Sequence, residues 1–214
     1  AGTTGQIATL IMGADAAWGD SHGPVSPNPE PVRATVNETA VIEVANILSK
    51  GGKTALLLEN QGAEQAAMEV ASRIASKTGC RLLNGTFPAR VDGGPGRGSV
   101  ERLPYFPEQI LAALKGTEHL ILVGGEIPAS FFAYRGIPGQ MVPEGCKVSR
   151  LSFIEEDSFE ALQRVAERVG AMQSEVTRFQ KADIGKPTGE LDNKSTVRAI
   201  AATMPEDAIV CTDS

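Results

Sequence analysis

The segment HLILVGGE, residues 119–126, is a run of large apolar residues that ends in two glycines and a glutamate. Such a run, without polar alternation, is typical of a strand that is buried on both faces of a sheet. The segment KTALLLEN, residues 53–60, has the same character. Two strands of this kind indicate a parallel sheet that is covered by helices.

Helical patterns alternate with these strands along the chain. The best-defined helix begins at Asp157, an N-cap residue that is followed three positions later by Glu160, as in a capping box. Further helices are expected from Asn37 and over residues 62–79 and 107–116, and further strands over residues 81–85 and 147–153. This alternation predicts an α/β fold with one doubly wound, Rossmann-like parallel sheet and helices on both faces, spanning residues 35–170.

Two polar segments rich in proline and glycine flank the predicted domain. GDSHGPVSPNPEPVRA covers residues 19–34, and QSEVTRFQKADIGKPTGELDNK covers residues 173–194. Neither segment has a sustained helical or strand period, so we expect linkers over residues 20–34 and 171–194.

A further apolar strand is expected beyond each linker, at residues 7–12 and 208–211. The second of these strands follows a predicted helix for which Ser195 is the expected N-cap. Because both strands lie outside the linkers, the expected organisation is a middle domain with stubs of both neighbouring domains.

The composition is that of an ordinary globular protein, with 42% hydrophobic and 21% charged residues. The formal net charge is -6 and the sequence has no basic run, which argues against a nucleic-acid or membrane partner. The apolar stretches are shorter than a membrane span, and the first residues lack a signal-peptide pattern. We therefore expect a cytoplasmic protein.

No metal site is expected from the cysteines and histidines. Cys80, Cys146 and Cys211 are far apart in the sequence and form no C-x-x-C pair, which indicates reduced thiols packed as small hydrophobic side chains. His22 and His119 stand alone, without a nearby nucleophile or carboxylate motif. No catalytic residue is expected either, because the chain has neither a G-x-S-x-G elbow nor a P-loop.

Three residues are candidates for cofactor binding. Arg97 lies in the loop GGPGRG, residues 93–98, where it or Arg90 could meet a phosphate, although a surface loop is the simpler interpretation. Gly124 and Gly125 belong to VGGE, residues 123–126, which ends a central strand. Parallel sheets bind ligands at such strand ends, although a glycine pair also permits close backbone packing. The aromatic residues of SFFAYRG, which include Phe131, Phe132 and Tyr134, either line a pocket or belong to the core.

The order of these segments resembles that of the thiamine-diphosphate-dependent enzymes of the acetolactate synthase and benzoylformate decarboxylase group. GQIATLIMGADAAW is similar to the last strand of their pyrimidine-binding domain, EVANILSKGGKTALLLENQG to the opening of their central domain, and MPEDAIVCTDS to the entry strand of their pyrophosphate-binding domain. The resemblance implies the end of the pyrimidine-binding domain, a linker, the central domain, a second linker and the start of the pyrophosphate-binding domain, at residues 1–19, 20–34, 35–170, 171–194 and 195–214.

The resemblance implies a parent enzyme that needs thiamine diphosphate and magnesium, acts on a 2-oxo acid by decarboxylation and carboligation, and forms a homodimer or homotetramer. The family's activating glutamate and its G-D-G motif with a following asparagine are not found in the sequence. The resemblance therefore implies that the 214-residue chain alone is inactive.

Flavin binding is a separate question, because acetolactate synthase holds FAD in its central domain. The loop at residues 93–98 does not stand directly between a strand and a helix, which is the geometry that holds a pyrophosphate. We therefore predict that the domain binds no flavin. The alternative to the whole assignment is a self-sufficient FAD- or NAD-binding module, in which the terminal strands complete the module's own sheet.

Overall fold

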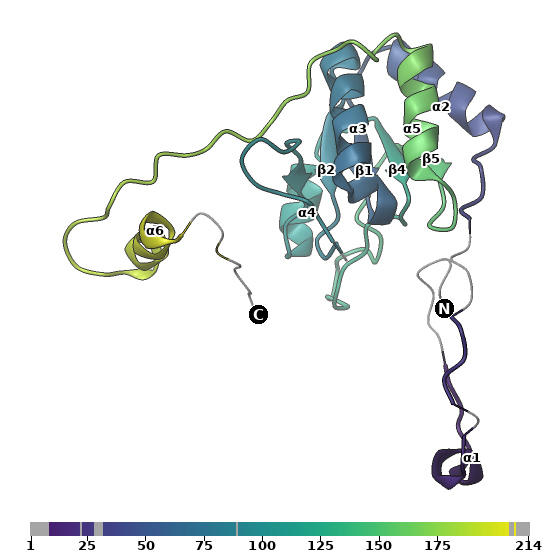
Figure 1. Ribbon diagram of the computed structural model, residues 1–214. Helices are drawn as coiled ribbons and strands as arrows, with labels where there is room; N and C mark the ends of the chain where they lie inside the picture. The colour runs from purple at the N-terminus through teal and green to yellow at the C-terminus, as the bar shows by residue number, and fades with distance from the viewer. Residues whose placement is uncertain (1–8, 22, 28–31, 89, 206–207, 209–214) are drawn as a thin grey trace. The chain divides into compact units, whose positions relative to one another are not determined.

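The computed structural model describes residues 9–21, 23–27, 32–88, 90–205 and 208. The chain divides into two units, Ala1–Phe179 and Gln180–Ser214, which are described separately. Figure 1 shows the first unit as a sheet with helices packed against it. Among the described residues, no helix is both long and apolar enough to cross a membrane.

The first unit contains one parallel sheet of five strands in the order β3-β2-β1-β4-β5. The strands are β1 (Thr54–Leu58), β2 (Arg81–Asn84), β3 (Glu101–Arg102), β4 (His119–Val123) and β5 (Lys147–Ser152). Every residue of β1 is buried, as its unbroken apolar run predicts. The predicted doubly wound fold is confirmed, and the two-residue strand β3 is an addition to it.

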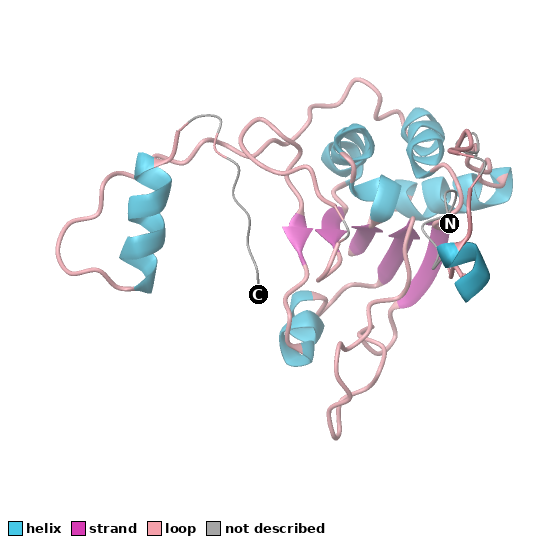
Figure 2. Cartoon of the chain, turned by 60° about the horizontal axis from the view of Figure 1, so that its bottom comes forward, coloured by secondary structure: helices cyan, strands magenta, loops and turns pink. Residues whose placement is uncertain are grey.

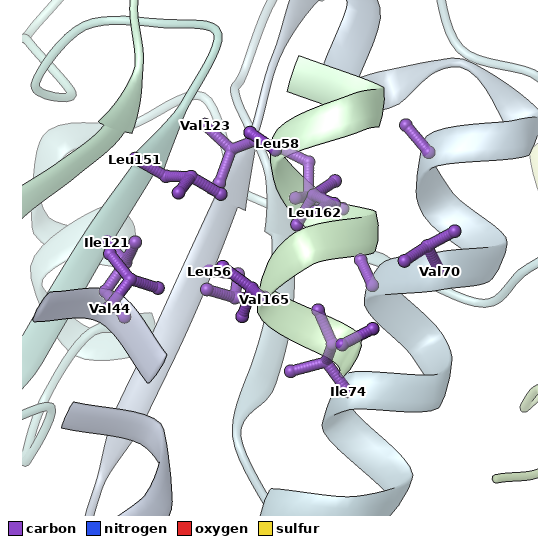
Figure 3. Packing of buried hydrophobic residues seen from close by; sticks show 14 of the residues in the cluster. Val44, Leu56, Leu58, Val70, Ile74, Ile121, Val123, Leu151, Leu162 and Val165 are labelled. Atoms are coloured by element: carbon purple, nitrogen blue, oxygen red, sulfur yellow. The ribbon is translucent and has the colours of Figure 1, made fainter. Parts of the chain in front are cut away.

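Three helices cover one face of the sheet (Figures 1 and 2). They are α2 (Glu38–Ser49), α3 (Gln65–Thr78) and α5 (Ser158–Arg168). Figure 3 shows Val44, Ile74 and Leu162 from the three helices in one buried cluster with Leu56 and Ile121 of the sheet. The helix α5 begins as expected, since the Asp157 side chain accepts a hydrogen bond from the backbone N of Glu160 at 2.9 Å.

The second face of the sheet is covered less regularly. It carries the short helix α4 (Pro107–Ala113) and the segment 124–146, which crosses from β4 to β5 without a helix. Met141 of this segment is fully buried against the sheet. Helices therefore lie on both faces as predicted, but the glycines and prolines of segment 124–146 leave loop in the place of a second helix.

The strand order places a topological switch point between β1 and β4. The chain leaves β1 toward β2 by way of α3 on one face, and it enters β4 from β3 by way of α4 on the other face. Parallel strands all end at the same edge, and ligands of doubly wound domains bind at that edge beside the switch point. The residues that follow β1 and β4 therefore define the place to search for a site.

The chain enters the sheet domain at one edge and leaves it at the other. Ala34 forms a parallel bridge with Glu156, just after the edge strand β5. Near the opposite edge, residues 172–179 lie along α3 and pair with the loop that precedes β3. Backbone N of Phe179 donates to the carbonyl of Arg97 at 2.9 Å, and backbone N of Thr177 donates to Ser72 Oγ at 2.8 Å.

The sequence predicts that residues 172–179 are part of a linker, but these bonds attach them to the domain. We refer to residues 172–179 as the strap. The strap extends the first unit to Phe179. The predicted linker at residues 20–34 includes residues 23–27, which have no regular structure. The domain limits themselves stay a prediction.

The segments outside the sheet domain agree only in part with expectation. Residues 9–12 form no strand, and most of the strand expected at residues 208–211 lies outside the described residues. A short helix, α1, covers Ala14–Trp18. In the second unit, α6 (Asn193–Thr203) is capped by Asp192, whose side chain accepts from backbone N of Ser195. Ser195, the third helical residue, completes a capping box, because its hydroxyl accepts from backbone N of Asp192. Ser195 is therefore not the N-cap, because Asp192 offers the stronger acceptor one turn earlier.

Candidate functional site

The side chain of Glu59 lies at the switch point. It follows β1 directly and reaches between the glycines that follow the neighbouring strands, Gly85 after β2 and Gly125 after β4. A methyl group at either glycine would overlap the Glu59 carboxylate. Backbone N of Glu126 donates a hydrogen bond to Glu59 Oε2 at 3.3 Å. The carboxylate thus fills the space between three strand ends.

Burial raises the pKa of the Glu59 carboxyl above its usual value. The backbone hydrogen bond from Glu126 acts in the opposite direction, and the negative charge of the Glu126 side chain raises the pKa further. A carboxyl group that is held in a desolvated position beside a second carboxylate costs stability when it is ionised.

Gly124 has a positive φ of +71° and a crowded environment. A Cβ at this position would lie 2.7 Å from the carbonyl oxygen of Glu59 and 2.9 Å from Ser158 Oγ. Asn60, whose φ of 49° is also left-handed, donates from Nδ2 to the Gly124 carbonyl at 2.8 Å. Gly124 thus packs closely against the backbone of Glu59, whereas Gly125 packs against the Glu59 side chain. A cofactor-binding role for Gly124 and Gly125 stays a prediction.

Two of the helices that begin at this edge, α5 and α3, have N-termini that are occupied by the chain's own oxygen atoms. In α5, backbone N of Ser158 donates to Gln61 Oε1 at 2.7 Å, beside the Asp157 cap. In α3, backbone N of Gln65 donates to Asp92 Oδ2 at 3.1 Å. This backbone hydrogen bond and the ion pair with Arg90 lower the pKa of Asp92, which is therefore an anion at neutral pH.

Arg97 lies in a turn where its backbone N donates to the Gly94 carbonyl at 3.1 Å, and its own carbonyl accepts from Phe179 of the strap. Its positive charge lowers the pKa of Asp92 as a minor contribution. The contacts of Arg97 and those of Gly124 and Gly125 are with different segments. The structure shows no contact that would join Arg97 and the glycine pair in one site. Phosphate binding by Arg97 stays a prediction.

Six aromatic side chains gather on the loops that follow β2, β3 and β4. The ring centroids of Phe87 and Phe131 are 5.1 Å apart, and those of Tyr105 and Phe131 are 6.1 Å apart. The cluster also contains Phe106, Phe132 and Tyr134. Phe131 is 63% exposed and Phe132 is 53% exposed, so assignment of these two residues to the core is wrong. They follow a glycine- and proline-rich loop and have no strand period that would turn them inward.

The described residues offer no metal site. No group of three or more histidine, cysteine, aspartate or glutamate side chains is arranged to hold a metal ion among the residues that the structure describes. Cys80 and Cys146 are free thiols, and burial raises the pKa of each. His119 begins β4, and its buried Nδ1 makes no hydrogen bond. Cys211 and His22 lie outside the described residues.

No known family profile matches the chain. Among curated proteins, it is 36% identical over 211 residues to IlvX of Mycobacterium tuberculosis, which is provisionally named as an acetolactate synthase large subunit. The match covers 98% of this chain, whereas the chain spans 40% of the length of IlvX.

Solved structures with the same fold are also much longer. A Mycobacterium smegmatis protein, provisionally described as a thiamin diphosphate-dependent enzyme, matches with a TM-score of 0.59 and 16% identity over 87% of this chain and 39% of its own. The thiamine diphosphate-dependent 4-hydroxybenzoylformate decarboxylase of Rhodococcus jostii matches with a TM-score of 0.59 and 17% identity over 91% of this chain and 38% of its own. Benzoylformate decarboxylase of Polynucleobacter necessarius gives a TM-score of 0.52 and 13% identity, covering 90% and 39%.

Proposed function

We propose that the chain belongs to the thiamine-diphosphate-dependent enzyme family and that it is the central domain of an enzyme that acts on a 2-oxo acid by decarboxylation and carboligation. The observation that carries this proposal is the 36% identity to IlvX over 98% of the chain. The strand order β3-β2-β1-β4-β5 supports it, because solved structures that bear this family's name share the fold. These relatives favour the proposal over a self-sufficient FAD- or NAD-binding module.

The described residues do not fit the cofactor of the family. Thiamine diphosphate is held through a divalent cation in the family that the sequence resembles, and no described group of carboxylates is arranged for such an ion. In this proposal, the described residues take no part in the chemical steps of the reaction. In this proposal, residues 35–170 form a structural domain and residues 20–34 and 171–194 lead into and out of it, with the strap bonded to the domain. Residues 1–19 and 195–214 belong to the neighbouring domains.

Expression of the complete gene with thiamine diphosphate and magnesium tests the proposal. We expect carbon dioxide release and acetolactate formation from pyruvate, and no turnover by the 214-residue chain under the same conditions. Benzoylformate, with benzaldehyde as the product, is the second substrate to measure. A complete product that binds no thiamine diphosphate, or that turns over neither 2-oxo acid, would contradict the proposal.

The subunit number and the cell compartment belong to the same proposal. We expect a cytoplasmic homodimer or homotetramer, which light scattering on the complete enzyme and cell fractionation would measure. A monomer that is fully active would contradict the assembly expected from the family resemblance.

A further inference from the structure

The β1-to-α3 connection is the segment at which a doubly wound domain ordinarily meets a ligand. In dinucleotide-binding domains, the diphosphate lies at the switch point, against the N-terminus of the helix that follows the first strand. Here that connection runs from Glu59, through the 3₁₀ turn Asn60–Ala63, to Gln65 at the start of α3. A carboxylate of the chain itself lies at each end of this connection: that of Glu59 at the first end and that of Asp92 at the second.

At the first end, the Glu59 side chain fills the space beside Gly85 and Gly125. These glycines have no side chains, so their backbones could approach a ligand closely. The carboxylate also accepts the backbone hydrogen bond of Glu126. Glu59 therefore supplies both the volume and the negative charge that a phosphate group would bring.

At the second end, Asp92 accepts from backbone N of Gln65 at 3.1 Å. The first N–H groups of a helix have no partner within the helix, and the helix dipole favours an anion there. Arg90 pairs with the other oxygen of the same carboxylate at 3.2 Å. An anion, a helix N-terminus and an arginine are thus combined in the way that phosphate binding would combine them.

We propose that Glu59 and Asp92 occupy the positions at which a doubly wound domain binds the diphosphate of a dinucleotide, so that this domain is closed to such ligands by its own carboxylates. The inference goes beyond the proposed function and does not depend on it. It gives a physical cause for the prediction that the domain binds no flavin.

Removal of both carboxylates should open the site. In the double variant Glu59→Ala, Asp92→Ala, the N–H groups of Glu126 and Gln65 lose their acceptors, and Arg90 loses its partner. A matched control, Glu59→Gln with Asp92→Asn, removes the charges but retains the volume and a carbonyl acceptor at each position. The control should therefore stay closed.

The measurement is the melting temperature of the 214-residue chain during titration with pyrophosphate, at ionic strength held constant with sodium chloride. We expect the melting temperature of the double alanine variant to rise by about 4 °C and then to saturate. A rise of this size is expected when the pyrophosphate concentration is well above the dissociation constant. The wild-type chain and the glutamine–asparagine control should rise by less than about 1 °C, the size of an unspecific salt effect.

Two outcomes would overturn the proposal. One is a saturable rise in the wild-type chain that equals that of the double alanine variant, since the carboxylates would then not exclude the anion. The other is a flat titration of the double alanine variant. Each single alanine variant is titrated in parallel and should show a smaller rise. If the double variant does not fold, the two single variants decide. The proposal is then overturned when pyrophosphate leaves the melting temperature of both single variants unchanged.

Discussion

At the residue scale, the charge of Glu59 sets a dependence of stability on pH. Its pKa is raised in the folded protein, so the folded state holds this proton more tightly than the unfolded state does. The stabilisation from the protonated Glu59 carboxyl is fully present below the pKa that this group has in the unfolded chain. It is lost as the pH rises through the higher pKa that the group has in the folded protein. Glu59 therefore makes the protein less stable at neutral pH than a neutral side chain of the same size would.

The variant Glu59→Gln tests whether the charge of Glu59 lowers the stability of the folded protein. We expect the variant to be more stable than the wild-type chain at pH 8 by about 0.5 kcal/mol, a value reduced because the group is partly exposed. The advantage should shrink as the pH falls to 5, and urea unfolding across that range measures it. An advantage that is constant with pH would show that the charge of Glu59 is not its cause.

A second residue-scale prediction separates two costs of replacing a glycine. Gly124→Ala places a methyl group 2.7 Å from the Glu59 carbonyl at a φ of +71°. Gly136→Ala is the matched control, because its φ is +79° and nothing lies within 4 Å of the added methyl group. We expect a loss of about 1 kcal/mol for the control and about 3 kcal/mol for Gly124→Ala, measured by urea unfolding. Equal losses would mean that the close approach to Glu59 costs nothing.

At the element scale, the strap is attached to α3 through a buried hydroxyl. Ser72 is 1% exposed, and its Oγ accepts from backbone N of Thr177 at 2.8 Å. Ser72→Ala leaves that N–H without its acceptor, so the amide of Thr177 should exchange its hydrogen about 10-fold faster, equivalent to roughly 1.4 kcal/mol. Ser76→Ala is the control, because the exposed Ser76 hydroxyl donates to the Glu175 carbonyl and takes no part in the Thr177 bond. An unchanged exchange rate at Thr177 in Ser72→Ala would contradict this account.

The elements themselves could be predicted from sequence because their signals are local. The buried strands β1 and β4 are runs of apolar residues, and the buried side chains of α3 recur at helical spacing. The sequence predicts the helix α6 but indicates Ser195 as its cap, because Asp192 lies within a polar segment that is typical of a linker. The strap was missed for the same reason, since its attachment is made by backbone groups and not by an apolar pattern.

The candidate site could be predicted only in part. Gly124 and Gly125 were identified because they end an obvious strand, and the structure places them at the switch point. Glu59 was missed, although it follows a strand of equal clarity, because its neighbours Gly85 and Gly125 are distant in sequence. Asp92 was missed because it caps α3 from a position 27 residues along the chain. Contacts of this kind depend on the assembled sheet and leave no periodic signal.

At the scale of the whole molecule, limited proteolysis should mark where the sheet domain ends. We expect cuts within residues 180–192 and within residues 23–27, which leave a stable fragment that retains the strap. Mass spectrometry of the fragment should give a C-terminus at or beyond Phe179, because residues 172–179 are bonded to α3 and to the loop at residues 93–99. Early cuts between residues 172 and 178 would contradict this, and resistance at both places would favour a single module.

The entry of the chain beside β5 and its exit beside β3 make the domain a spacer of fixed width. Ala34 is bonded next to one edge strand, and the strap is bonded next to the other. Five strands at their normal spacing place the two edge strands, β3 and β5, about 19 Å apart across the sheet. A pull on the two points would load the hydrogen bonds between neighbouring strands across the whole width. The sheet therefore sets a separation between whatever is attached at its two edges, and no flexible loop could set that distance.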